Sequence, residues 1–195
     1  LLSNPTGIYG KKPVLFYELS ELMKQAKERV IIHTPYVVLN GYMKRELTEI
    51  AGQVPDSRMV INSVENGDNF MASSDYLYRK NEVFNTGVQI LEYDGGVSYH
   101  GKSVVIDEDM SIIGSYNMDL RSTYVDTELM LAVQSRELTE ELTGYMEEME
   151  KDCRTVTGPD TYEVPEHIQV EEIPFWKKAA MRVVGLIMQP FRSMV

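Results

Sequence analysis

Apolar positions in the first half of the chain alternate between helical and strand spacing. Residues 13–28 place Leu15, Leu19, Leu22, Met23 and Ala26 at helical spacing, and a short apolar run from Val30 to near Val38 follows. The same order recurs, with helices expected over about 41–51 and 74–84 and strands over 59–64 and 88–93. Three helix-then-strand units in succession predict an α/β sandwich, with a mixed, mostly parallel sheet flanked by helices.

The spacing changes after Gly95 and Gly96, where closely spaced strands are expected over 97–107, 111–117 and 128–133. A helix over about 136–151 follows. Ser135 is a plausible N-cap, and Glu137 would place a negative charge at the positive end of the helix dipole. We therefore expect one domain over residues 1–153.

The last 42 residues differ in composition from this domain. Residues 154–173 contain prolines and acids with little periodicity, which predicts an extended acidic linker. The tail, residues 174–195, predicts an amphipathic helix that ends before Pro190. One side of its helical wheel is apolar. Two interpretations remain open: the tail lies on an anionic membrane through Trp176, Lys177, Lys178 and Arg182, or it docks on its own domain.

Charge and composition limit the partners. The chain has 195 residues, 43% of them hydrophobic, and its 19 basic and 30 acidic residues give a net charge of −11. Four of the cations lie in the tail, so the remainder carries −15, which argues against binding nucleic acid. One cysteine and three histidines cannot form a closed structural zinc site by themselves, and we expect neither a metal nor a cofactor. Since the chain begins at Leu1 rather than Met and has no signal segment, we expect a fragment or a processed product of a longer protein.

The candidate chemistry lies on two neighbouring predicted strands. His100 and Lys102 share one face of the first strand, and Ser115 and Asn117 share one face of the second. If Glu108 and Asp109 form a two-residue hairpin loop, His100 lies opposite Asn117 and Lys102 lies opposite Ser115. The four polar side chains then converge on one patch.

This set of groups suits a phosphodiester. Lys102, Ser115 and Asn117 could bind the phosphate oxygens, while the His100 imidazole could act on phosphorus or on the leaving group. Glu128 either orients His100 or pairs with Arg121. Asp107 belongs to the same catalytic set but points to the other face of its strand, which favours structural or electrostatic support.

The pattern His100-x-Lys102-x4-Asp107, followed by Gly114-Ser115-x-Asn117, resembles the signature of the phospholipase D superfamily. The flanking residues are similar to bacterial cardiolipin synthases, and the helix and turn from Tyr76 to Val88 resemble the C-type proteins in particular. These flanks are Thr34-Pro35-Tyr36, Asn62-Ser63 with Asp68, Asp119, Arg121-Ser122 and Glu128. From the resemblance we expect Tyr36, Asn62 and Arg121 to contact substrate.

The resemblance also implies a reaction. Superfamily members combine two such motifs; one histidine forms a phosphohistidine, and the other, more often the one in this half, protonates the leaving alcohol. This sequence has one motif, since neither His33 nor His167 is followed by the required lysine. We therefore expect the C-terminal half of a two-motif enzyme that acts on phospholipids.

Three functions remain open at this point. The first is phosphatidyl transfer between phospholipids, with the missing N-terminal half supplying the second motif. The second is phospholipase D or other phosphodiester hydrolysis by a homodimer. The third is a non-catalytic half that only binds membranes. The expected location is peripheral, on a membrane surface.

Overall fold

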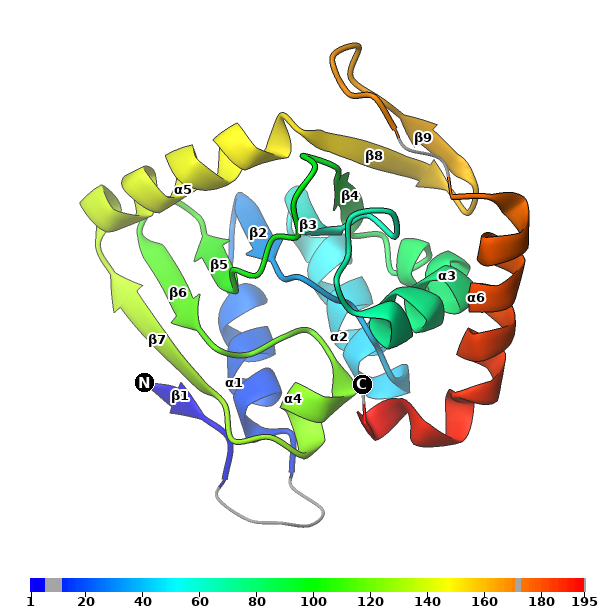
Figure 1. The fold of residues 1–195 in the computed structure, drawn as a ribbon. Helices are drawn as coiled ribbons and strands as arrows, with labels where there is room; N and C mark the ends of the chain where they lie inside the picture. The colour runs from blue at the N-terminus through cyan, green and yellow to red at the C-terminus, as the bar shows by residue number, and fades with distance from the viewer. Residues whose placement is uncertain (6–11, 171–172, 195) are drawn as a thin grey trace.

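The computed structural model describes residues 1–5, 12–170 and 173–194. Within these ranges the chain forms a nine-stranded sheet of order β1-β7-β6-β5-β2-β3-β4-β8-β9, with helices packed around it (Figure 1). The strands are β1 Leu2–Ser3, β2 Arg29–His33, β3 Asp56–Asn62, β4 Gln89–Tyr93, β5 Ser103–Ile106, β6 Met110–Gly114, β7 Leu129–Gln134, β8 Cys153–Gly158 and β9 Thr161–Glu163. The helices are α1 Val14–Met23, α2 Gly41–Gln53, α3 Phe70–Phe84, α4 Leu120–Tyr124, α5 Arg136–Glu150, α6 Phe175–Ile187 and the 3-10 helix η1 Gln189–Met194.

The predicted helix-strand order and the mixed sheet flanked by helices are confirmed, but the sheet is not mostly parallel. Strand β3 is parallel to both β2 and β4, whereas the other six pairings among the described strands are antiparallel. The reason lies in the connections. A helix links each parallel pair, but the loop between β5 and β6 is too short for a crossover and can join only antiparallel strands.

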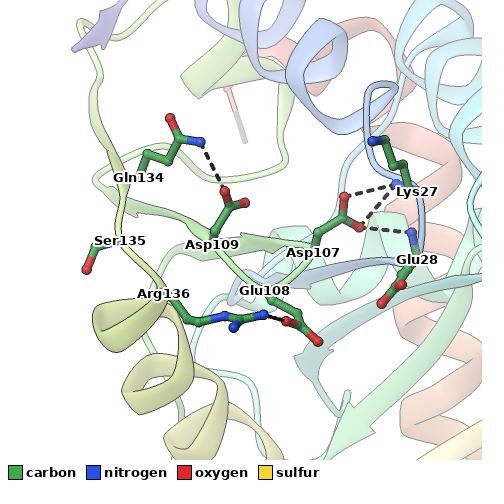
Figure 2. Close-up of a pocket in the computed structure, with 8 residues that line it drawn as sticks. All are labelled: Lys27, Glu28, Asp107, Glu108, Asp109, Gln134, Ser135 and Arg136. Carbon is green, nitrogen blue, oxygen red and sulfur yellow. Dashed lines mark hydrogen bonds and ion pairs between the residues drawn. The ribbon is translucent and has the colours of Figure 1, made fainter.

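The turn between β5 and β6 differs from the predicted one by a residue. Ile106 pairs with Met110, so the loop has three residues, 107–109, and Lys102 lies across from Gly114 rather than Ser115. Asp107 adopts a φ of 52°, a left-handed conformation that aspartate tolerates better than most residues. Its carboxylate accepts hydrogen bonds from the backbone N–H groups of Lys27 and Glu28 (Figure 2) and of Arg29. The turn is therefore fixed by contacts that the local sequence does not reveal.

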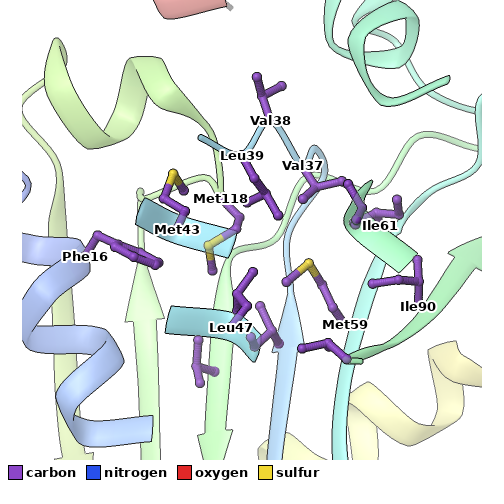
Figure 3. Packing of buried hydrophobic residues seen from close by; sticks show 14 of the residues in the cluster. Phe16, Val37, Val38, Leu39, Met43, Leu47, Met59, Ile61, Ile90 and Met118 are labelled. Atoms are coloured by element: carbon purple, nitrogen blue, oxygen red, sulfur yellow. The ribbon is translucent and has the colours of Figure 1, made fainter. Parts of the chain in front are cut away.

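The main core lies between the sheet and helices α1 and α2. Phe16 of α1, with Met43 and Leu47 of α2, packs on Met59 of β3 and on Met118 (Figure 3). Val37, just after β2, forms a parallel bridge to Met118, just after β6. This packing holds the segments that follow β2 and β6 together at one end of the sheet.

The linker predicted over 154–173 is wrong for its first part, because residues 153–163 form an edge hairpin. β8 pairs with β4, and β9 pairs with β8. Arg154 of β8 lies within 2.8 Å of Glu92, which is fully buried and also pairs with Lys80 at 2.6 Å. The positive charges of Arg154 and Lys80 thus compensate the charge of the buried Glu92 carboxylate. The pair between Arg154 and Glu92 attaches β8 to the sheet. Residues 171 and 172 lie outside the described residues.

The tail forms the predicted helix, α6, and α6 packs beside α3 (Figure 1). It makes contact through Met181 and Gly185, the two residues of α6 that are buried. None of the helices in the described part of the chain has the length and apolar character needed to cross a bilayer.

Candidate active site

His100 and Lys102 lie just before β5, at the end of the sheet where β2 and β3 finish. The Lys102 ammonium contacts the His100 ring at 2.9 Å from Nζ to Nδ1, and also donates to the His100 carbonyl oxygen at 2.7 Å. An ammonium group has no acceptor, so Nδ1 must accept and Nε2 must carry the proton of the neutral ring. His100 is exposed to solvent.

Asn62 fixes the segment that carries His100. Its side-chain Nδ2 donates to the carbonyl oxygens of Pro35 and Tyr99, and its Oδ1 accepts from the Tyr99 N–H at 2.8 Å. The amide is buried and its hydrogen bonds go to the protein. The Asn62 amide therefore holds the backbone of Tyr99, next to His100, and is buried where the sequence predicts a contact with substrate.

Tyr36 stands beside the imidazole. Its ring lies 5.9 Å from the His100 ring in an edge arrangement, and its hydroxyl donates to Asp68 at 2.7 Å. That hydrogen bond lowers the pKa of the Asp68 carboxyl, with burial opposing the change. Tyr36 therefore lies next to His100, a position that fits the substrate contact expected from the sequence. Asp68 was absent from the predicted site, although it lies in one of the flanks that resemble cardiolipin synthases.

Ser115 and Glu128 form a second cluster at the same end of the sheet. The Ser115 hydroxyl donates to the Glu128 carboxylate, whose other oxygen accepts from Ser122 at 2.9 Å. Gly114 makes this approach possible, because a Cβ there would collide with the Leu129 carbonyl oxygen. Both sequence-based alternatives for Glu128 are wrong: its hydrogen bonds go to the two serines rather than to His100, and Arg121 pairs with Asp126 at 3.0 Å.

Asn117 and Asp119 both contact Ser122 of this cluster. Burial raises the pKa of the Asp119 carboxyl to about 6, although hydrogen bonds from Ser122 and Asn117 oppose the shift. Asp119 also caps α4 by accepting from the Ser122 N–H at 2.6 Å. Asn117 Oδ1 is buried and has no hydrogen-bond partner among the described residues. An unpaired buried acceptor costs about 1–3 kcal/mol, so a hydrogen-bond donor that reached Asn117 Oδ1 would stabilise the folded protein.

Lys102 links the two clusters electrostatically. Partial burial lowers the pKa of its ammonium, while the negative charges of Glu128, Asp119 and Asp68 act in the opposite direction. Within the described ranges, no hydrogen bond joins His100 or Lys102 directly to Ser115 or Asn117. The predicted groups therefore gather at one end of the sheet, but in two clusters rather than as the paired patch of the predicted register.

Two of the predicted residues stand apart from His100. Arg121 is exposed and engaged with Asp126. Asp107 lies at the opposite end of β5 and helps line an open cavity of about 580 Å³ (Figure 2). Four carboxylates and two cations border this cavity, which makes it unsuited to phosphate. Asp107 holds the start of β2 by accepting from three backbone N–H groups, which fits the structural support expected from the sequence.

Comparison with known proteins identifies the class of fold and site. A family model described as "Cardiolipin synthase, PLD-like domain" matches residues 19–150, more than half of the chain. The chain belongs to this family of phospholipase D-like domains. The narrower resemblance to C-type cardiolipin synthases stays a prediction.

Individual relatives agree with this assignment. Cardiolipin synthase A of Yersinia pseudotuberculosis is 29% identical over 108 residues, which is 55% of this chain and 22% of the relative. Phosphatidylserine synthase of Haemophilus influenzae has a TM-score of 0.72 at 16% identity, over 100% of this chain and 47% of that chain. A phospholipase D family member of Salmonella typhimurium has a TM-score of 0.59 at 17% identity, over 74% of this chain and 91% of that chain. The two solved structures show the shared fold, and the chain matches about a fifth of the length of its curated relatives.

Proposed function

We propose that this chain supplies one half of a phospholipase D-type active site that transfers a phosphatidyl group between phospholipids. The observation that carries the proposal is the contact of 2.9 Å between Lys102 Nζ and His100 Nδ1 at an exposed end of the sheet. It presents an imidazole N–H and an ammonium group side by side. An ammonium group neutralises phosphate oxygens, and an imidazole N–H can protonate a departing alkoxide.

The tautomer assigns a role to His100. With Nδ1 accepting from Lys102, Nε2 holds a proton and has no free lone pair for attack on phosphorus. His100 is then the general acid, and an imidazole from a second half is the nucleophile. That nitrogen forms a bond to phosphorus, the ester P–O bond breaks, and the leaving oxygen takes the proton from His100 Nε2. Lys102 Nζ passes a proton to His100 Nδ1 across their 2.9 Å contact, so the ring stays neutral.

The second step reverses these roles. The hydroxyl of an acceptor lipid gives its proton to His100 Nε2 and attacks phosphorus, and the phosphorus-nitrogen bond of the phosphohistidine breaks. His100 Nδ1 returns its proton to Lys102 Nζ, which restores the starting state. Lys102 binds the phosphate oxygens in both steps. Tyr36 limits access of water and substrate to one side of the imidazole, because its ring lies 5.9 Å away. No cofactor takes part in this scheme.

Exposed apolar side chains support completion of the site by a second half. Ile113 of β6 and Leu131 of β7 form a cross-strand pair, and each is about half exposed. Leu129 is also half exposed, and its N–H donates to Ser115 Oγ at 3.1 Å. An apolar patch that begins at a site residue is suited to a protein interface.

A second candidate is phosphodiester hydrolysis by two copies of this chain. It is favoured by the similar Salmonella structure, of which 91% is covered, since a unit of this size forms nearly the whole of that chain. In that arrangement two His100 side chains would meet at one phosphorus. The charge of −15 outside the tail argues against nucleic acid as the substrate.

The test measures turnover of phosphatidylglycerol by the complete protein that carries this chain. We expect cardiolipin and glycerol as products, and His100→Ala should lower kcat by about 10²–10⁴-fold, the usual contribution of a general acid. His167→Ala is the control, because His167 is an exposed histidine that contacts Asp152. Phosphatidic acid as the product would support hydrolysis instead. Unchanged turnover in His100→Ala would refute both candidates.

A further inference from the structure

Helix α6 is fixed to the domain through one narrow face. Met181 is buried, and Gly185 lies so close to α3 that an added Cβ would collide with the Ser74 carbonyl oxygen and lie 2.7 Å from Tyr78 Cβ. The two helix backbones therefore approach each other directly at Gly185. This contact uses the side of α6 opposite to most of the apolar residues on the helical wheel.

The end of the tail is fixed by a buried ion pair. Arg192 of η1 donates from Nε and Nη2 to the two oxygens of Asp75, at 2.7 and 2.9 Å, and also donates to the Leu39 carbonyl oxygen. Asp75 is 2% exposed, so this bidentate pair is shielded from water. The position of the tail is therefore set at Gly185 and at Arg192.

The docking leaves apolar side chains of the tail exposed. Exposed fractions are 87% for Phe175, 72% for Trp176 and 64% for Ile187, and Val183 and Leu186 are each 54% exposed. At 100° per residue these five side chains fall within an arc of about 120°. Phe191 and Met194 of η1 are also exposed. We call these seven residues the α6 apolar face.

Cations border the α6 apolar face. Lys177 and Arg182 flank the arc on its two sides, and Lys178 lies beyond Arg182. Arg182 pairs with Asp160, whereas neither Lys177 nor Lys178 has an ion-pair partner within the described ranges. The segment 175–194 has no acidic residue, although the chain as a whole carries −11.

We propose that the α6 apolar face lies on the surface of an anionic phospholipid bilayer. Exposed aromatic and aliphatic side chains enter the boundary between headgroups and acyl chains, while the flanking lysines meet the anionic headgroups. The combination of cations and apolar side chains favours a bilayer. An acidic protein partner would pair with the cations, but it would also have to bury the seven apolar side chains. The proposal does not depend on chemistry at His100. It resolves the two sequence-based interpretations of the tail, because one face of α6 docks while the other stays free.

Trp176 provides the probe, because it is the one tryptophan of the chain. Its fluorescence is measured as the 195-residue chain is mixed with vesicles of phosphatidylglycerol and phosphatidylcholine. We expect a blue shift, quenching by lipids brominated in their acyl chains, and weaker binding to vesicles of phosphatidylcholine alone. The double variant L186S/I187S should bind the vesicles with an affinity lowered by about tenfold or more, because two exposed apolar side chains no longer enter the bilayer.

Tyr145→Ser is the matched control, since Tyr145 is 69% exposed on α5. It should bind vesicles like the unchanged chain, and L186S/I187S should keep the thermal midpoint because both positions are exposed. Unshifted and unquenched Trp176 fluorescence overturns the proposal. The proposal is also overturned if light scattering shows a dimer that L186S/I187S dissociates, while the unchanged chain does not bind vesicles. A second copy of the chain would then be the occupant of the α6 apolar face. The His100→Ala chain should bind vesicles normally, so this test is independent of the proposed reaction.

Discussion

Replacing Lys102 by methionine is expected to lower kcat/KM of the complete protein by about 10²–10³-fold, the usual loss when one group that stabilises transition-state charge is removed. Methionine keeps an unbranched side chain of similar length but cannot bind phosphate. The same change removes the hydrogen bond to His100 Nδ1 and with it the preference for a proton on Nε2. Steady-state rates with phosphatidylglycerol measure the effect.

A matched control separates this role from the general effect of charge. Lys27→Met removes an exposed lysine that borders the cavity at the opposite end of the sheet, so the rate should stay within about twofold of the original, as expected for a surface change away from the site. The thermal midpoint of Lys102→Met should be close to that of the unchanged protein, because the ammonium is only partly buried. A large fall in that midpoint with unchanged kcat/KM would show Lys102 to be structural.

Asp107→Ala is expected to lower the free energy of unfolding by about 2–3 kcal/mol, through the lost backbone hydrogen bonds and the strain of alanine at positive φ. The φ of 52° and the bonds from Lys27, Glu28 and Arg29 are the cause. Urea unfolding measures the loss. Turnover by the protein that remains folded should be unchanged, and a selective loss of turnover would place Asp107 in the reaction.

The stability that Asp107 contributes should depend on pH. Burial disfavours its charge, but the hydrogen bonds from the backbone of Glu28, Lys27 and Arg29 outweigh burial and lower the pKa of its carboxyl. A carboxyl with a lowered folded pKa contributes stability that is present above its unfolded value of about 3.9 and is lost as the pH falls through the folded value. The stability difference between the unchanged protein and Asp107→Asn should therefore shrink below about pH 4. A constant difference down to the folded pKa would contradict the assigned role.

Much of the fold follows from local periodicity. The three helix-strand units and helix α5 could be predicted because each buries one face, and Ser135 caps α5 as expected by accepting from the Leu138 N–H. Strand β8 could not be predicted this way. Its segment is polar, and its stability comes from pairing with β4 and from the buried contact between Arg154 and Glu92, which is distant in sequence.

The gathering of the predicted residues at one end of the sheet followed from the sequence more than their contacts did. His100, Lys102, Ser115, Asn117 and Glu128 reach one end of the sheet because their strands end there. Their partners depend on a one-residue difference in the turn at Asp107, which the sequence pattern does not determine. The positioning role of Asn62 depends on contacts with residues 35 and 99, and these become neighbours only in the folded chain.

The central claim is that His100 and Lys102 handle the phosphate of a diester. A crystal structure of the complete protein with tungstate, which mimics phosphate, tests it most directly. The anion is expected within hydrogen-bond distance of His100 Nε2 and Lys102 Nζ. Tungstate bound instead beside Lys27 and Arg136, with His100 and Lys102 left as they are, would contradict the assignment of the active site.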